Sequence, residues 1–242
     1  MLDVRFTSEI TVKPVQSMGG DHMVVAAAKV STSGDEAMKF ASEENAEANA
    51  GLIGYLMRYR HGTPFEHSAV TFFVHAPAFV WWEWVRHRIG FSYNIESGRY
   101  KVLEPVFWVP RPDRKMIPAP DHKPSRPKFV VAARYEFLDV EGEMRVACLR
   151  AYEAYQRILG VGVASEVARS VLPFSVYYSG WVTCNPRSLM AFLSLRTHEP
   201  DATFVSYPQA EIEEAARATE EILKTGWPLT YAAFCKNGRV GP

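Results

Sequence analysis

Hydrophobic and polar residues change their spacing several times in the first part of the chain. A loose alternation from Val4 to Val12 predicts a strand, and Asp21–Val30, which opens on a typical N-cap residue, predicts a short helix. Ser31 follows that helix and is most simply a turn residue. Apolar residues then return at helical spacing between Asp35 and Tyr59, whereas Ser68–His75 has the pattern of a strand.

The segment His61–His67, with the sequence HGTPFEH, interrupts this pattern just before the predicted strand. Gly62 and Pro64 predict a turn, and Thr63, Glu66 and the two histidines place polar groups beside the strand. The two histidines match no common metal-ligand spacing and have no cysteine nearby. We therefore expect no metal site here.

One of the most apolar segments of the chain begins at Pro77, a residue favoured at the first position of a helix. Phe79–Val85 is apolar almost all round, which predicts a buried helix. Glu83 is the exception, and it precedes Arg86 by three residues and His87 by four, so the three share a helix face. A structural ion pair and a ligand-facing role fit this spacing equally well.

The stretch Arg86–Arg99 places three arginines and a histidine beside a loop that contains hydroxyl groups and glycine. A multiply charged anion, such as a nucleotide phosphate, would explain cations next to a core. A solvated basic helix end, favoured by the helix dipole, explains them as well. On a helix, Arg86 and Arg88 would point about 200° apart, which suits two ligands, or two parts of one.

Prolines dominate Val102–Pro127, which predicts a long surface excursion rather than a domain boundary. Phe129–Leu159 is predicted to form a long amphipathic helix with Cys148 on its apolar stripe. A short helix over Ala164–Leu172 follows, with Arg169 in its last turn, and then a strand over Phe174–Val182.

The pair Asn185-Pro186 predicts the start of a helix over Arg187–Arg196, with an N-cap followed by proline at the first helical position. Leu189, Leu193 and Arg196 recur on one face of that helix. An arginine in line with core leucines is costly unless it is paired, so Arg196 is a candidate functional residue.

The part of the chain after Arg196 is predicted to be a turn-rich segment followed by a helix. His198–Pro208 has turn residues, and Glu211–Lys224 is a charged amphipathic helix. Trp227 and Phe234 are expected to dock the last residues on the core.

Composition then excludes several classes of protein. The 242 residues carry 27 Lys plus Arg and 27 Asp plus Glu, so the formal net charge is zero. A nucleic acid would find no overall positive charge to bind, and a site for an anion must depend on local charges. Three cysteines, Cys148, Cys184 and Cys235, lack CxxC spacing, which favours the reducing cytoplasm over a disulfide framework. The sequence contains neither a secretory leader pattern nor a run of 18 apolar residues, so we expect no membrane association.

Four separated blocks together resemble one family, the flavin-dependent thymidylate synthases. Their signature is Arg-His-Arg followed, after seven residues, by Ser-x-Arg; here Arg86-His87-Arg88 and Ser97-Gly98-Arg99 are separated by eight residues. The other blocks are His61–His67, Ala168–Pro173 and the segment that runs from Asn185 to Arg196. The resemblance extends from about Val25 to Phe234.

The resemblance implies an α+β fold, with a mixed or antiparallel sheet flanked by helices, in a single domain over residues 1–242. It also implies a homotetramer whose active sites form where chains meet. Residues similar to the family's FAD contacts are Ser31, His61, Thr63, Glu66, Arg86, His87, Arg88, Ile89, Asn185 and Arg187. Residues similar to its nucleotide contacts are Glu83, Arg86, Ser97, Gly98, Arg99, Arg169 and Arg196.

The implied reaction is C5 methylation of dUMP or UMP, without a covalent enzyme nucleophile. Methylenetetrahydrofolate supplies the carbon, the reduced flavin supplies a hydride, and NADPH re-reduces the flavin. Arg196 is the implied catalytic residue, at a uracil carbonyl, and Ser97-Gly98-Arg99 would hold the phosphate. This agrees with three cysteines that have no base or basic cluster nearby in sequence to activate them. The alternative is a flavin- or nucleotide-binding relative that has lost methylation.

Two departures from the family pattern lie beside the implied nucleotide site. The additional residue of the spacer is most simply placed within Ile89–Phe91. Within the same spacer, this chain has Ile95-Glu96 where the family pattern has Glu followed by an apolar residue. In the family, the sequence His-Ala-Gln-x-Glu-Ile follows the residue that corresponds to Arg196. Here it is not in that place, and only Pro208–Ile212 resembles its last residues, after about seven added residues. A branch of the family acts on UMP, and the choice between ribose and deoxyribose stays open at this point.

Overall fold

A computed structural model describes residues 3–40 and 45–242 of the chain. By its internal contacts the chain forms two compact units, each assembled from three separate segments. Unit 1 comprises Met1–Ile10, His75–Glu83 and Ile95–Ser179, and unit 2 comprises Thr11–Val74, Trp84–Asn94 and Gly180–Pro242.

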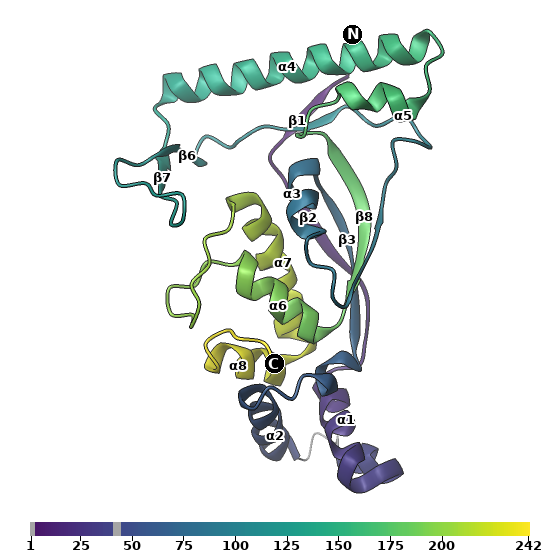
Figure 1. The fold of residues 1–242 in the computed structure, drawn as a ribbon, viewed down its shortest axis with the longest axis vertical. Helices are drawn as coiled ribbons and strands as arrows, with labels where there is room; N and C mark the ends of the chain where they lie inside the picture. Colours follow the sequence, from purple (N-terminus) through teal and green to yellow (C-terminus); the bar gives the residue numbers. More distant parts are fainter. Residues whose placement is uncertain (1–2, 41–44) are drawn as a thin grey trace. The chain divides into compact units, whose positions relative to one another are not determined.

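Unit 1 is built around its longest helix, α4 (Arg134–Gly160), which contacts the short helix α5 (Ser165–Ala168) and the 3-10 turn η4 (Arg169–Val171) (Figure 1). The remaining elements are helix α3, which begins here, and four short strands. β1 pairs in parallel with β5, and β6 pairs antiparallel with β7. Their bounds are α3 (Ala78–Trp84), β1 (Arg5–Thr7), β5 (Val106–Trp108), β6 (Lys115–Pro118) and β7 (Phe129–Val131). Phe107, Tyr152 and Tyr155 lie at the centre of its core.

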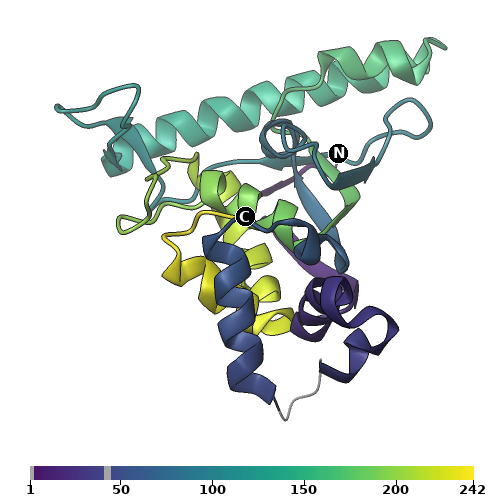
Figure 2. The same ribbon diagram turned by 60° about the horizontal axis from the view of Figure 1, so that its bottom comes forward.

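Unit 2 is mainly helical, and Figure 2 shows its helix α2 close to α8. Its C-terminal helices pack on one another, and α7 also covers strand β2. The helical elements are α1 (Asp21–Ser33), η1 (Gly34–Phe40), α2 (Ala46–Arg58), η3 (Thr63–Glu66), α6 (Pro186–Arg196), α7 (Ala210–Gly226) and α8 (Pro228–Lys236).

A four-stranded sheet has the order β2-β3-β8-β4. Its strands are β2 (Thr11–Met18), β3 (Ala69–Pro77), β8 (Tyr177–Cys184) and β4 (Phe91–Ile95). β3 and β8 are the most buried strands, as expected for the centre of a sheet. The α+β class with helices flanking the sheet is therefore confirmed. Within 3–40 and 45–242, no helix is long and apolar enough to cross a bilayer.

The helix predicted after Pro77 is shorter than expected. Pro77 is the last residue of β3, and α3 ends at Trp84, so Arg86 and Arg88 do not lie on a helix. The argument that those two arginines point 200° apart therefore does not apply. The prediction of burial all round is also wrong, because Trp82 is 58% exposed whereas Trp84 is fully buried.

The long helix begins later than its pattern suggested. Phe129–Val131 forms β7, and α4 starts at Arg134. Cys148 is buried on it as predicted, but Val140 of the predicted stripe is 38% exposed. The expected excursion over Val102–Pro127 contains strands β5 and β6.

Three further predictions near the N-terminus change. Val4–Val12 is divided between β1 and β2, and α1 runs on to Ser33, so Ser31 is helical and its hydroxyl donates to the carbonyl of Ala28 at 3.1 Å. Of the helix expected over Asp35–Tyr59, the structure has η1 and α2; residues 41–44 lie outside the described part.

Asp21 was expected to cap its own helix, but Gly20 is the N-cap of α1. The Asp21 carboxylate instead accepts hydrogen bonds from the backbone N–H groups of Leu229 (2.7 Å) and Thr230 (3.0 Å), and from the Thr230 hydroxyl (2.6 Å). Asp21 therefore satisfies the free N–H groups at the start of α8, where a negative charge also complements the helix dipole.

Candidate functional site

Two of the sequence blocks meet at the N-terminus of α6. Asn185 is the N-cap as predicted, and its side-chain oxygen accepts from the Ser188 N–H at 2.8 Å. The guanidinium of Arg187 donates to Glu66 of the HGTPFEH block at 2.6 Å. Gly62 lies so close to Arg187 that a Cβ there would come within 2.4 Å of the guanidinium. Glycine at this position therefore permits the two blocks to approach.

A turn over Arg88–Phe91 brings the Arg-His-Arg block to the same place. Gly90 has a φ of 69°, and a Cβ on it would lie 2.1 Å from the Ser188 hydroxyl oxygen. Only glycine combines this backbone conformation with such a close approach. The segment expected to carry the additional residue of the spacer thus forms a tight turn against the start of α6.

Arg196 and His87 lie together, a pairing that the sequence did not predict. The Nε–H of Arg196 donates to Nε2 of His87 at 3.0 Å, and the His87 ring packs edge-on against Phe192 at 4.9 Å. Burial, reinforced by the charge of Arg196, lowers the pKa of His87 from 6.5 to about 4. His87 is therefore a neutral acceptor at neutral pH. The hydroxyl of Tyr93 donates to the His87 carbonyl at 2.6 Å and fixes this part of the loop.

A cavity of about 760 Å³ opens beside these blocks in unit 2. Four of the residues predicted to contact flavin line it: Glu66, Ile89, Asn185 and Arg187. Phe204–Ser206, in the region of the added residues, and Arg239–Pro242 also line the cavity. A volume in the usual range for ligand sites, mostly apolar walls and a few charged groups suit a large ring system with polar edges.

The remaining predicted flavin contacts are placed differently. Ser31, His61, Thr63, Arg86 and Arg88 are exposed, and His87 is partly buried. None of these six appears among the described residues that line this cavity. His61 stacks on Tyr55 with ring centres 5.8 Å apart. These residues are available to a ligand or partner but do not converge on one point within unit 2.

The predicted nucleotide contacts divide between the units. Arg86 and Arg196 belong to unit 2, whereas Glu83, Ser97, Gly98, Arg99 and Arg169 belong to unit 1. In unit 1, Gly98 is buried and a Cβ on it would lie 3.1 Å from Cδ of Arg169. The block Ala168–Pro173 therefore contacts the block Ser97-Gly98-Arg99, as the resemblance implied.

Arg99 has a partner that sequence reasoning missed. Its Nε lies 2.9 Å from a carboxylate oxygen of Glu166, and both side chains are about half exposed. An exposed pair of this kind is weak, so a phosphate would exchange with Glu166 at little cost. The hydroxyl of Ser97 accepts from the Arg99 N–H at 3.3 Å and stabilises the turn.

Glu96, at the second position where the spacer departs from the family pattern, has a structural role in unit 1. It accepts from the Ser179 N–H at 3.1 Å and pairs with Lys101 at 2.6 Å. His75 lies in the same small cavity of about 240 Å³ and contacts the Ser179 hydroxyl at 3.1 Å. Burial raises the pKa of Glu96, but the hydrogen bonds from Lys101 and Ser179 outweigh burial and leave it below its usual value.

Neither buried cysteine is prepared for nucleophilic attack. Burial raises the pKa of Cys184 far above its ordinary value and also raises that of Cys148. A thiol with a raised pKa carries little thiolate at neutral pH. Across the described part of the chain, no group of three or more histidine, cysteine or acidic side chains is placed to hold a metal ion.

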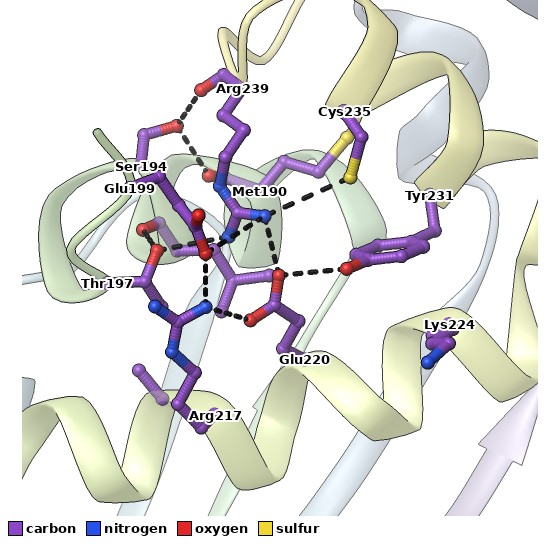
Figure 3. A network of polar contacts seen from close by, with 12 residues as sticks. Met190, Ser194, Thr197, Glu199, Arg217, Glu220, Lys224, Tyr231, Cys235 and Arg239 are labelled. Carbon is purple, nitrogen blue, oxygen red and sulfur yellow. Dashed lines mark hydrogen bonds and ion pairs between the residues drawn. The ribbon is translucent and has the colours of Figure 1, made fainter. Parts of the chain in front are cut away.

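A polar network near the cavity was not anticipated. Figure 3 shows Arg239 directed at Glu220, whose other oxygen receives Arg217. Arg239 reaches Glu220 at 2.6 Å and Thr197 at 3.0 Å. No sequence motif marks these residues, since the pair of Arg239 and Glu220 joins the segment after α8 to helix α7. A further residue missed was Phe204, which the sequence assigned only to a turn-rich segment.

The protein thus has an α+β fold in which three separated sequence blocks contribute Glu66, Ile89, Asn185 and Arg187 to one ligand-sized cavity. A family model described as thymidylate synthase complementing protein matches residues 14–229. The chain is 47% identical over 237 residues to a flavin-dependent thymidylate synthase of Streptomyces avermitilis, covering 98% of this chain and 95% of that protein. It is 47% identical over 244 residues to one from Tropheryma whipplei, covering 100% of this chain and 99% of that protein. The chain therefore belongs to the flavin-dependent thymidylate synthase family, and it is an enzyme of that type.

A solved structure agrees with this assignment. The UMP/dUMP methylase PolB from Streptomyces cacaoi, crystallised with 5-Br dUMP, matches with a TM-score of 0.90 and 42% identity. The match covers 99% of this chain and 100% of that chain. The same methylase crystallised with 5-Br UMP matches with a TM-score of 0.88.

Proposed function

We propose that this enzyme transfers a one-carbon unit to C5 of a uridylate, dUMP or UMP, and reduces it to a methyl group. Methylenetetrahydrofolate is the proposed carbon donor, FAD the resident cofactor and NADPH its reductant. The observation that carries the proposal is the cavity of about 760 Å³ lined by Glu66, Ile89, Asn185 and Arg187, which come from three separated family blocks.

These residues fit a flavin by their chemistry. Arg187, already oriented by Glu66, offers N–H donors to a carbonyl or phosphate oxygen. Asn185 is held by its cap hydrogen bond to Ser188, so its side chain is positioned before a ligand arrives. Ile89 is 92% exposed and presents an apolar surface to a ring. When bound, a reduced flavin would supply the hydride that completes the methyl group.

Arg196 is the proposed catalytic residue. A guanidinium beside a uracil carbonyl stabilises negative charge on the ring and so makes C5 more nucleophilic. Its hydrogen bond to a neutral His87 orients the guanidinium without neutralising it. The raised pKa values of Cys148 and Cys184 agree with a route that needs no thiolate.

The proposed phosphate site is the turn of Ser97, Gly98 and Arg99, together with Arg169, in unit 1. Arg169 packs beside Gly98, and Arg99 is held by an exposed partner that a phosphate can replace. Glu83 and Arg86 are further proposed nucleotide contacts. Ser97 is proposed as a binding residue, since its hydroxyl accepts the Arg99 N–H and so belongs to the same turn.

A homotetramer that shares its flavin sites between subunits is the proposed assembly. Several exposed apolar side chains on α4, among them Tyr135 (69%) and Leu138 (53%), suit burial against other chains. Ser31, His61, Thr63, Arg86 and Arg88, which do not line the cavity, are the flavin contacts expected to serve a neighbouring chain's site. Light scattering of the purified enzyme tests the mass of the assembly.

Tritium release from nucleotide labelled at C5 tests the activity directly. With methylenetetrahydrofolate and NADPH present, we expect release from dUMP, UMP or both, and a flavin absorbance in the purified protein. Parallel kinetics on the two nucleotides decide the preferred sugar. Bound flavin without tritium release would favour a relative that has lost methylation, and absence of both would overturn the proposal.

A further inference from the structure

Phe204 and Val205 form one wall of the cavity in unit 2. They belong to His198–Pro208, where the chain departs from the family pattern by its added residues. The Phe204 side chain is 73% exposed and Val205 is 39% exposed. An exposed phenyl ring that faces a ligand-sized cavity is available to pack against a planar ligand.

Hydrogen bonds on both sides of these two residues anchor the wall. The N–H of Thr203 donates to the carbonyl of Gly238 at 3.0 Å. A Cβ on Gly238 would lie 2.1 Å from the Thr203 hydroxyl oxygen, so the two backbones approach closely. On the other side, the hydroxyl of Ser206 donates to the Leu195 carbonyl at 2.7 Å, and its own carbonyl lies 2.7 Å from Nδ1 of His198. Phe204 is thus held between two fixed points.

The network around Arg239 holds the neighbouring part of the same wall (Figure 3). Arg239 has a φ of 58°, a left-handed conformation that is unfavourable for a non-glycine residue. Its N–H donates to the Phe234 carbonyl at 2.9 Å, and its carbonyl accepts from the Ser194 hydroxyl at 2.7 Å. Its guanidinium pairs with Glu220 at 2.6 Å. These bonds hold the backbone that leads into Val240–Pro242, which lines the cavity.

We propose that Phe204 packs against the ring system of the bound flavin, and that Arg239 is a positioning residue for this wall. The inference rests on the proposed flavin site. Ile89 and Phe204 supply apolar contact area, while Arg187, Glu66 and Asn185 supply polar partners for ring edges. Because the backbone on both sides of Phe204 is anchored, contact with a ring costs little backbone entropy on binding.

The first test replaces Phe204 and titrates flavin-stripped enzyme with FAD. Loss of one aromatic contact in Phe204→Ala is expected to raise the Kd by roughly 10- to 100-fold and to change the absorbance and fluorescence of bound flavin. Phe204→Tyr keeps the ring and is expected to restore both. Phe129→Ala is the matched control, because Phe129 is also an exposed phenylalanine but lies on β7 of unit 1.

The second test examines positioning. Arg239→Gln removes the charge that pairs with Glu220, and we expect a smaller increase in Kd, roughly 3- to 10-fold, with a flavin spectrum altered in the same direction as in Phe204→Ala. A general loss of stability would lower the melting temperature without that spectral change. The melting temperature is therefore recorded beside the spectrum, with flavin bound in both enzymes.

The outcomes separate this inference from the function on which it rests. If the unaltered enzyme binds no FAD, the proposed function fails and the inference fails with it. If it binds FAD but Phe204→Ala has the same Kd and spectrum, only the inference is overturned. A change in the mass of the assembly with unaltered flavin binding would overturn it too, because Phe204 would then be a subunit contact.

Discussion

Arg196 and Arg239 both belong to unit 2, yet they are paired in opposite ways. Arg239 is 9% exposed and meets the carboxylate of Glu220, itself 5% exposed, at 2.6 Å. Arg196 donates at 3.0 Å to His87, a ring that is neutral at neutral pH. The first contact joins two opposite charges out of water, and the second places a guanidinium N–H against an uncharged ring. This difference fits a structural role for Arg239 and the proposed catalytic role for Arg196.

The pKa shifts of the two partners express the same difference. Burial raises the pKa of Glu220, but hydrogen bonds and charges from Arg239 and Arg217 outweigh burial and hold it below its usual value. Burial lowers the pKa of His87 to about 4, and Arg196 adds to that shift. One arginine therefore stabilises a charged partner, and the other helps to keep its partner uncharged.

The largest expected effect is on catalysis, from Arg196→Ala. Loss of a charge that stabilises the reacting ring is expected to lower kcat by about 100-fold or more, while FAD stays bound. Tritium release and the flavin spectrum of the same preparation measure the two effects. Arg196→Lys keeps a charge and is expected to retain more activity. Unchanged turnover in Arg196→Ala would remove the contrast with Arg239.

Glu220→Gln is expected to have the largest effect on stability. The substitution keeps the shape of the side chain but leaves the buried Arg239 without its nearest charge partner, which typically costs about 3–5 kcal/mol. Urea unfolding of the flavin-bound enzyme measures the change in the free energy of unfolding. A loss below about 1 kcal/mol would mean that Glu199, 4.0 Å from Arg239, is a sufficient substitute.

The pH dependence of stability is expected to separate the two partners. His87 has a lowered pKa, so between its ordinary value of 6.5 and about 4 the unfolded chain binds the extra proton, and stability falls as the pH falls through that window. Glu220 also has a lowered pKa, but its contribution is lost only below about 4.5, the ordinary value for glutamate. His87→Gln keeps an acceptor for Arg196 without titration. Its stability curve should be flatter than that of the unaltered enzyme above pH 4.5.

The smallest effect is expected from an exposed pair on α4. Arg145 and Glu141 are 2.7 Å apart one helical turn from each other, with side chains 41% and 22% exposed. Glu141→Gln is expected to change the free energy of unfolding by about 0.5 kcal/mol or less. A loss as large as that of Glu220→Gln would show that burial does not explain the strength of the Arg239 pair.

The sequence predicted the local structure around the candidate site correctly where the signals are local. The Asn185 cap needs only its next few residues, and the face shared by Leu189, Leu193 and Arg196 follows from helix geometry. Leu189 and Leu193 are fully buried, as that face requires. The resemblance to a family supplied the blocks, and the structure brings Glu66, Asn185 and Arg187 together at one cavity.

Other features depend on partners that a local pattern does not contain. The pairing of Arg239 with Glu220 joins a segment after α8 to the middle of α7. The end of α3 at Trp84 was missed because the apolar pattern continues to Val85, while Tyr93 of the next strand accommodates the turn by bonding to the Trp84 carbonyl at 3.0 Å. Tertiary contacts of this kind override local preference.

The Asp21 cap has a consequence for the order in which the protein is made. Its carboxylate bonds to the start of α8, 208 residues further along the chain. A ribosome that has released α1 must still synthesise the two later segments of unit 1, His75–Glu83 and Ile95–Ser179, before that partner exists. Until then, the Asp21 carboxylate on the first helix of unit 2 lacks its donors on α8, and the incomplete unit is a possible substrate for chaperones. Unit 2 is therefore expected to complete its folding only after translation has passed α8.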